Sequence, residues 1–535
     1  MNDDIEKLTA LELAAAIKNK KISVFDAVSA YIDKIEKNDK QFNTFISISK
    51  ESALARAKEI QSRIDNNDTL SLSPLAGVPV ALKDNIFTKE METTCASRML
   101  NGYKSVFDAA VVEKLENAGM IVIGKLNMDE FAIGSTGRTG FFGVVRNPWD
   151  AVNDNRITCS NCAAGSNYTA DSDCTTSYKQ TADKNISAGN VCVAGDGSAA
   201  AIAAGETPIA LGTDTGGGIR QPCSFCGVTG IKPTYGSVSR YGIAAYASSL
   251  DQAGPVGQDI NDCAALLSII SGPDKRDSTC IIKKPFEFSD EKAGMNACEY
   301  SDSIKGVKIG IPVNYLCGKI DEDIKNSVLA AAKEYEAAGA IIEEFEMPLM
   351  DYILPVYNII SSAEASSNLA KFDGLKYGYR STNSKTLSDV YRLSRSEGFG
   401  LEVKRKIMLG SFVLSSGNYD VYYKKALQAR TLIINAYNKL FEQFDCILSP
   451  VTPTTACMSG EIMDMYMGDI YTASVNLSGL PAVSLPCGFD RFGLPIGFQI
   501  IGGVFSESKL IDTARVYQKR TDFHRKKPGG KISHI

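Results

Sequence analysis

The stretch LGTDTGGGIRQPCSFC, residues 211–226, decides how this chain folds and where its chemistry lies. An apolar run ending at Leu211 predicts a strand, residues from about 219 predict a helix, and a glycine-rich turn joins the two. Backbone N–H groups of such a turn converge on one point, where they suit a small anion or a developing oxyanion. They belong to Thr215, Gly216, Gly217 and Gly218.

Strand and helix patterns alternate on both sides of this unit. Strand patterns occur at 120–123, 307–312, 340–348, 446–450, 482–489 and 495–503, and helix patterns at 108–118, 198–204, 321–338 and 401–441. At the start, Thr9 with Glu12 and Ser23 with Asp26 have capping-box spacing. This alternation predicts an α/β protein built on one largely continuous sheet, as a single domain over 1–535 with a helix-rich cap at 350–440.

Composition narrows the class of protein. The 535 residues carry a net charge of −5 and lack the basic surface that direct binding to nucleic acid requires. No run of about eighteen apolar residues and no basic, apolar leader occurs, so we expect a cytoplasmic protein without membrane contact. The only two histidines, His524 and His534, lie near the C-terminus. A Ser-His-Asp or Cys-His mechanism is therefore disfavoured.

Residues 151–193 form a polar segment without helical or strand periodicity, and we interpret it as an insertion. Four of the fourteen cysteines cluster there: Cys159, Cys162, Cys174 and Cys192. Their thiolates could bind zinc, but only the first pair has the usual C-x2-C spacing. Free thiols are the alternative, and we assign no metal.

A second candidate site lies in PLAGVPVALKDNIF, residues 74–87, which places Lys83 at the end of an apolar strand. A lysine in such a run either reaches the surface at a strand edge or lies buried, where it can act as a base. The spacing alone leaves both alternatives open.

Together with KPTYG at 232–236 and SSLDQAGP at 248–255, these motifs resemble the amidase signature family. The resemblance implies a large mixed sheet flanked by helices on both faces. It also implies a mechanism in which a lysine, here Lys83, accepts a proton through a middle serine, in a cis peptide, from a nucleophilic serine. Aligning the family's GGSSGGSAAA-like run with SAAA at 198–201 places Ala194 at the middle serine and Gly218 at the nucleophile.

Both hydroxyl groups of the family mechanism are therefore absent. Ser198 lies about one helical turn beyond Ala194, and Cys223 lies five residues past Gly218, so neither occupies the lost position. The oxyanion turn survives both substitutions. We therefore expect this chain to bind an amide substrate but not to turn it over through a serine.

Further motifs resemble the amidotransferase A subunits of this family: NMDEFAIGS at 127–135, RNPWD at 146–150, EVKRKI at 402–407 and DIYT at 469–472. The resemblance implies glutamine hydrolysis that supplies ammonia for converting Glu-tRNA(Gln) to Gln-tRNA(Gln), with the B and C subunits as partners. The B subunit would hold the tRNA, ATP and Mg²⁺, and this chain would need no cofactor. Glutamine recognition maps to Arg405 or Lys406 for the carboxylate and to Asp469 for the ammonium.

Three functions remain open at this stage. The first is an amidotransferase A subunit with the family's glutaminase role. The second is a non-catalytic binding or scaffold subunit of the same complex, suggested by Ala194 and Gly218. The third is a stand-alone amidase acting on another small amide.

Overall fold

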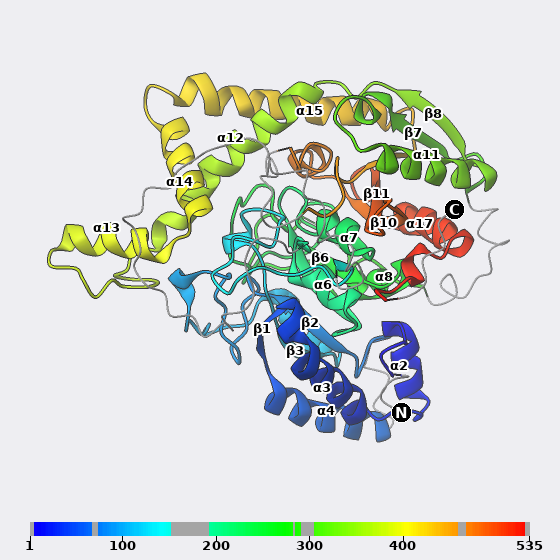
Figure 1. The fold of residues 1–535 in the computed structure, drawn as a ribbon, viewed down its shortest axis with the longest axis horizontal. Coiled ribbons are helices and arrows are strands. Elements are labelled where there is room, and N and C mark those ends of the chain that lie inside the picture. Colours follow the sequence, from blue (N-terminus) through cyan, green and yellow to red (C-terminus); the bar gives the residue numbers. More distant parts are fainter. Residues whose placement is uncertain are drawn as a thin grey trace.

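The computed structural model describes residues 5–66, 73–150, 192–281, 284–289, 304–457 and 467–529. Eleven strands in these residues form one mixed sheet, in the order β1-β3-β2-β4-β6-β5-β10-β11-β9-β7-β8. Helices cover both faces of this sheet (Figure 1). The predicted α/β class and the continuous sheet are confirmed.

The strands are β1 (Phe45–Ile48), β2 (Pro79–Lys83), β3 (Ile121–Leu126), β4 (Ile209–Asp214), β5 (Thr229–Lys232), β6 (Gln252–Gly257), β7 (Lys308–Pro312), β8 (Ile341–Phe345), β9 (Cys446–Pro450), β10 (Ala482–Phe489) and β11 (Pro495–Gly502). The α-helices are α2 (Ala10–Lys18), α3 (Val24–Phe42), α4 (Lys50–Asp65), α5 (Ala110–Asn117), α6 (Gly197–Ala203), α7 (Arg220–Cys226), α8 (Ile260–Ile270), α11 (Glu322–Ala337), α12 (Met350–Asn368), α13 (Leu387–Gly398), α14 (Leu401–Leu414), α15 (Lys424–Leu440), α16 (Ala473–Leu477) and α17 (Glu507–Arg520).

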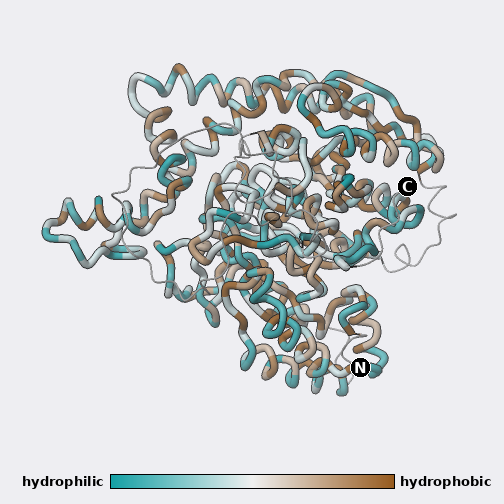
Figure 2. Tube along the Cα trace, viewed as in Figure 1, coloured by the Kyte–Doolittle hydropathy of each residue, from teal (hydrophilic) through white to brown (hydrophobic). Residues whose placement is uncertain are grey.

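Amphipathic helices pack on the sheet. In Figure 2 the outer helices alternate between hydrophobic and hydrophilic residues, and α3 buries one face that includes Val24, Val28 and Ile35. Thr9 and Ser23 cap α2 and α3 through their hydroxyls, as their sequence spacing predicts. No helix in the described ranges combines the length and apolar character needed to span a membrane.

The helices between 350 and 440 arch over one side of the sheet (Figure 1), and α12 packs against α14 and α15. The helix pattern predicted over 401–441 corresponds to two α-helices with a break between them. Helix α14 ends at Leu414, and a π-helical turn at Tyr419–Tyr423 precedes α15. The intervening SSGN at 415–418 favours a turn over a helix, which explains the break.

Strand directions determine where the glycine-rich turn and Lys83 meet. Strand β2 runs parallel to both β3 and β4, with Ala81 opposite Ala210 and Leu82 opposite Leu211. The carboxyl ends of neighbouring parallel strands lie at the same sheet edge, which is a usual place for a site in α/β proteins. Lys83 therefore ends beside the turn that follows β4.

Candidate active site

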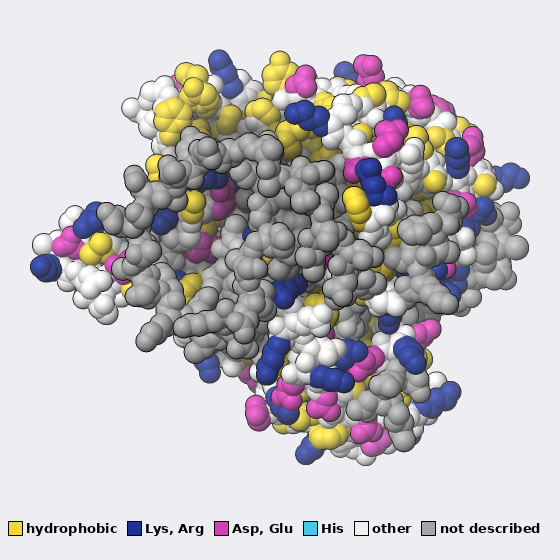
Figure 3. Space-filling view, viewed as in Figure 1, with side chains coloured by type: hydrophobic (Ala, Val, Ile, Leu, Met, Phe, Trp, Pro, Cys, Tyr) yellow, Lys and Arg dark blue, Asp and Glu magenta, His cyan; other side chains and the backbone are white. Residues whose placement is uncertain are grey.

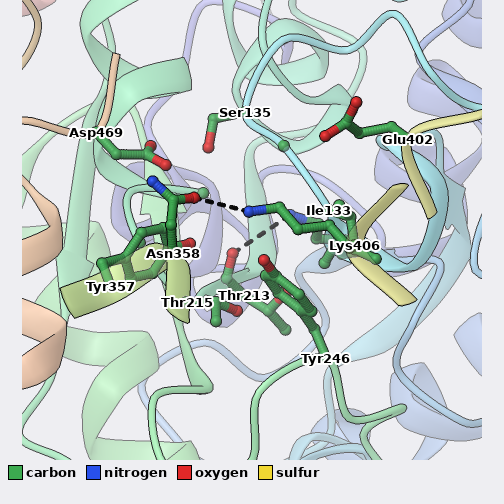
Figure 4. A pocket seen from close by; sticks show the side chains of 15 residues that line it. Ile133, Ser135, Thr213, Thr215, Tyr246, Tyr357, Asn358, Glu402, Lys406 and Asp469 are labelled. Atoms are coloured by element: carbon green, nitrogen blue, oxygen red, sulfur yellow. Dashed lines mark hydrogen bonds between the residues drawn. The ribbon is translucent and has the colours of Figure 1, made fainter. Parts of the chain in front are cut away.

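A pocket opens where β2 and β4 end, between the sheet and helices α12 and α14. Figure 4 shows its polar side chains pointing into a common space. The lining residues come from seven parts of the chain: Lys83; Ala132, Ile133, Gly134 and Ser135; Thr213, Thr215, Gly216 and Gly218; Tyr246; Tyr357 and Asn358; Glu402 and Lys406; and Asp469.

The turn at 215–218 forms the floor of this pocket. A Cβ added to Gly216 would lie 2.3 Å from the hydroxyl oxygen of Tyr357, so only glycine lets that ring close over the turn. Within the described part of the chain, no acceptor is hydrogen-bonded to the four backbone N–H groups of 215–218. These four N–H groups are therefore without a hydrogen-bonded acceptor among the described residues, and their role as oxyanion donors stays a prediction.

A buried ion pair between Asp214 and Arg220 supports the turn from behind. The Nε and Nη2 atoms of Arg220 each donate a hydrogen bond of 3.0 Å to the carboxylate. Its Nη1 atom donates to Oε1 of Gln499 at 2.9 Å. Burial alone would raise the pKa of Asp214, but the charge and hydrogen bonds of Arg220 outweigh it and hold that pKa well below its usual range. The turn therefore rests on a fully charged, buried pair.

Lys83 lies buried at the end of β2, so the strand-edge alternative does not apply. Its amine forms an ion pair with Asp196, with 2.6 Å between Nζ and Oδ2. The same amine donates to the carbonyl of Thr213 at 3.3 Å. In this structure Lys83 binds a carboxylate and a backbone carbonyl instead of serine hydroxyls.

Asp196 is the most important residue that the sequence analysis missed. It caps α6, accepting a 2.7 Å hydrogen bond from the N–H of Ser198, and this holds its carboxylate beside the Lys83 amine. The alignment could have singled out Asp196. The same alignment that places Ala194 at the middle serine places Asp196 where the family run has glycine.

Of the two substituted serine positions, Gly218 lines the pocket beside Lys83 and Ala194 does not line it. A Cβ added to Gly218 would lie 3.6 Å from the Lys83 amine and only 2.7 Å from the Thr213 carbonyl oxygen. Ala194 is fully buried, and no peptide bond among the described residues is cis. Ser198 and Cys223 are buried and do not line the pocket.

The lining of the pocket carries both signs of charge, in Lys406 and Asp469. Lys406 donates to Asn358 at 2.8 Å, and Asp469 accepts from Gln221 at 2.7 Å (Figure 4 shows the first bond). Burial lowers the pKa of Lys406 and raises that of Asp469 to about 7, although Lys406 itself favours the carboxylate form of Asp469. Arg405 lies outside the lining, half-exposed, with its guanidinium 2.7 Å from Glu402.

Three further lining residues, Tyr246, Tyr357 and Asn358, also escaped the sequence analysis. They come from a loop and from α12, far from the glycine-rich turn in sequence. Nothing in their local pattern separates them from ordinary helix and loop residues.

The predicted cysteine cluster falls largely outside the described residues, which exclude Cys159, Cys162 and Cys174. Cys192 is buried, with its sulfur 3.7 Å from the carbonyl oxygen of Ala456. Within the described ranges no group of three or more histidine, cysteine, aspartate or glutamate side chains could hold a metal ion.

A family model described as Amidase matches residues 26–157 and 173–511, and the chain belongs to this family. Within the family, the chain is 46% identical to the A subunit of the glutamyl-tRNA(Gln) amidotransferase of Agathobacter rectalis, over 98% of this chain and 95% of the relative. It is equally identical to the protein of that name from Lachnoclostridium phytofermentans, over 98% of this chain and 99% of the relative. The unmatched residues 158–172 lie inside the predicted insertion.

Two solved structures are also similar to this chain over almost its whole length. The crystal structure of the glutamyl-tRNA(Gln) amidotransferase A subunit from Thermotoga maritima is 35% identical, with a TM-score of 0.71 over 97% of this chain and 96% of that chain. The peptide amidase of Stenotrophomonas maltophilia is 25% identical, with a TM-score of 0.72 over 96% of each chain.

Proposed function

We propose that this chain is the A subunit of a glutamyl-tRNA(Gln) amidotransferase complex that binds an amino acid without forming a serine acyl-enzyme. Similarity to the named A subunits over almost the whole chain supports the subunit role. The observation that carries the second part is the ion pair between Lys83 and Asp196, beside a position that holds glycine.

Acyl transfer through a serine needs a hydroxyl that attacks the carbonyl carbon and a base that accepts its proton. Gly218 and Ala194 supply no hydroxyl, and the amine of Lys83 is bound to a carboxylate. The unoccupied N–H groups of 215–218 can still stabilise an oxyanion, and in other hydrolases that remnant gives roughly a thousandfold acceleration over water. The site therefore retains binding and at most a residual rate.

The charges of Lys406 and Asp469 fit the zwitterionic end of an amino acid. The Lys406 ammonium can bind the ligand's α-carboxylate, and the Asp469 carboxylate can bind its α-ammonium. The ligand's side chain then extends across the pocket toward residues 215–218. This places the amino acid's distal group at the unoccupied N–H donors.

Assembly with other subunits is consistent with an apolar surface on α14, α15 and the turn between them. Figure 3 shows hydrophobic side chains gathered there at the upper left. They include exposed Met408, Phe412, Tyr419, Val421 and Tyr422. Such surfaces mark protein–protein contacts. In the proposed complex, a partner subunit holds ATP, Mg²⁺ and the tRNA, and this chain needs no cofactor.

The test is reconstitution with the B and C subunits, followed by calorimetry with glutamine and glutamate and by an ammonia assay with glutamine. We expect a stable complex and saturable binding of an amino acid, with ammonia release at a residual rate. Failure to assemble would contradict the subunit role. Rapid ammonia release would instead support the family's glutaminase role.

Lys406→Met should weaken amino-acid binding about tenfold or more, because the ligand's α-carboxylate loses a buried, charged partner. Arg405→Met is a matched control on the same helix. Its side chain is half-exposed and lies outside the pocket, so it should change the affinity less than about twofold. Equal effects of the two substitutions in calorimetry would refute the assignment of Lys406.

Amino-acid binding should tighten as the pH rises from about 5.5 to 7.5. The pKa of Asp469 in the empty pocket is about 7, so below this pH the carboxyl is neutral and binds an ammonium poorly. Affinity should fall toward tenfold per pH unit on the acid side. It should fall again at alkaline pH, because burial lowers the pKa of Lys406. Calorimetry across this pH range tests the prediction. Asp469→Asn is the control, because its binding should no longer weaken at acid pH.

A further inference from the structure

The floor of the pocket offers more free hydrogen-bond donors than free acceptors. In the described part of the chain, the backbone N–H groups of 215–218 have no hydrogen-bonded acceptor, and Thr215, Gly216 and Gly218 line the pocket. The Lys83 ammonium lies beside them, 3.6 Å from where a Cβ on Gly218 would be. The N–H groups favour negative charge, whereas the charge of Lys83 is already paired with Asp196.

Most acceptors around the same point are already engaged, although Oδ1 of Asn85 and Oγ of Ser198 have no hydrogen-bond partner among the described residues. The carbonyl of Thr213 accepts from Lys83, and its hydroxyl accepts from the amide of Asn85 at 3.0 Å. The two oxygens of Asp196 accept from Lys83 and from the N–H of Ser198. The carbonyl of Gly216 accepts from the hydroxyl of Thr472. A new donor arriving here would have to compete for most of these acceptors.

This imbalance distinguishes a carboxylate from a carboxamide. A carboxylate only accepts hydrogen bonds, whereas a carboxamide brings an NH₂ group with two donors that need acceptors. Burying an unpaired donor is costly, so a pocket with spare donors discriminates against the amide. The negative charge of Asp196 does not offset this preference, because Lys83 neutralises it at 2.6 Å.

Resting on the proposed function, we propose that the ligand of this pocket is an α-amino acid with a side-chain carboxylate, with glutamate preferred over glutamine. The α-ammonium and α-carboxylate bind Asp469 and Lys406, and the side-chain carboxylate binds the N–H groups of 215–218. Loss of the serines thus converts a site for amide hydrolysis into a receptor for an acidic amino acid.

Calorimetry of the reconstituted complex with L-glutamate and L-glutamine tests this inference at a fixed pH near 8. We expect glutamate to bind about tenfold or more tightly than glutamine. Glutamine binding as tightly as glutamate would overturn the inference and leave the proposed function standing. Binding of neither amino acid would overturn both.

The variant Asp196→Asn gives an independent readout. It keeps the shape of the side chain and removes the charge that neutralises Lys83, so the ammonium becomes available to a carboxylate ligand. Glutamate affinity should rise several-fold, with glutamine affinity changed less than about twofold. An equal change for both ligands would contradict the placement of the side-chain carboxylate at this end of the pocket.

Discussion

A variant carrying Ala194→Ser, Asp196→Gly and Gly218→Ser should release ammonia from glutamine at least about 100-fold faster than a variant carrying only the two serines. The two serines restore the nucleophile and the relay, but they leave Lys83 bound to Asp196 at 2.6 Å. An ammonium ion held by a carboxylate cannot accept a proton. General-base catalysis contributes about 10²- to 10⁴-fold, and this is the factor that Asp196→Gly should recover.

The geometry of the turn adds to this requirement. A side chain at position 218 would place its Cβ 2.7 Å from the Thr213 carbonyl oxygen, so the backbone of Thr213 or of the turn must shift. That carbonyl is also bound by Lys83, so releasing the lysine from Asp196 helps both groups to rearrange. Glycine at 196 keeps most of the helix capping, so the variant should fold.

Ammonia assays on the reconstituted complexes test whether Asp196 restricts Lys83. The variant with Asp196→Gly alone is the inactive control. If the double-serine variant were as active as the triple variant, Asp196 would not restrict Lys83. Activity of the single Asp196→Gly variant would show that another nucleophile operates.

Arg220→Met should lower the free energy of unfolding by about 3–5 kcal/mol, the usual cost of breaking a buried ion pair by removing one partner. The substitution leaves the fully buried Asp214 carboxylate without its cation and frees the acceptors on Gln499 and Thr472. Because Arg220 holds the pKa of Asp214 down, the carboxyl of the variant should protonate more readily. The deficit in stability should therefore be smaller at pH 4 than at pH 7.

Urea unfolding followed by circular dichroism measures this change. Arg491→Met provides a control, since Arg491 pairs with Asp321 and Asp323 but is 63% exposed. Surface pairs of this kind contribute about 0–1 kcal/mol. A loss below about 1 kcal/mol for Arg220→Met would mean that the buried pair does not support the turn.

Local sequence patterns predicted the sheet and most of its strands, and the family resemblance placed Lys83 beside the turn. These features depend on short-range periodicity, strand order and the direction of parallel strands. The residues on the outer side of the pocket could not be predicted in the same way. Tyr357 and Asn358 reach it from α12, more than a hundred residues from the turn, and only the packing of the helices brings them there.

Asp196 illustrates a different limit. A polar residue before SAAA has the pattern of an ordinary helix cap, and it does cap α6. That its second oxygen binds Lys83 depends on how α6 packs beside β2, which no local pattern specifies. In the same way, the sequence left Arg405 and Lys406 as alternatives, and the rotation of α14 places only Lys406 in the pocket.

The most direct test of the central claim is a search for a covalent glutamyl-enzyme. The reconstituted complex is mixed with glutamine, quenched in acid within one turnover time of an active relative, and this chain's intact mass is measured. We predict a mass equal to that of the unmodified chain, together with calorimetric binding of an amino acid to the same preparation. A glutamyl adduct on any serine or cysteine of this chain would contradict the claim that its serine chemistry has been lost.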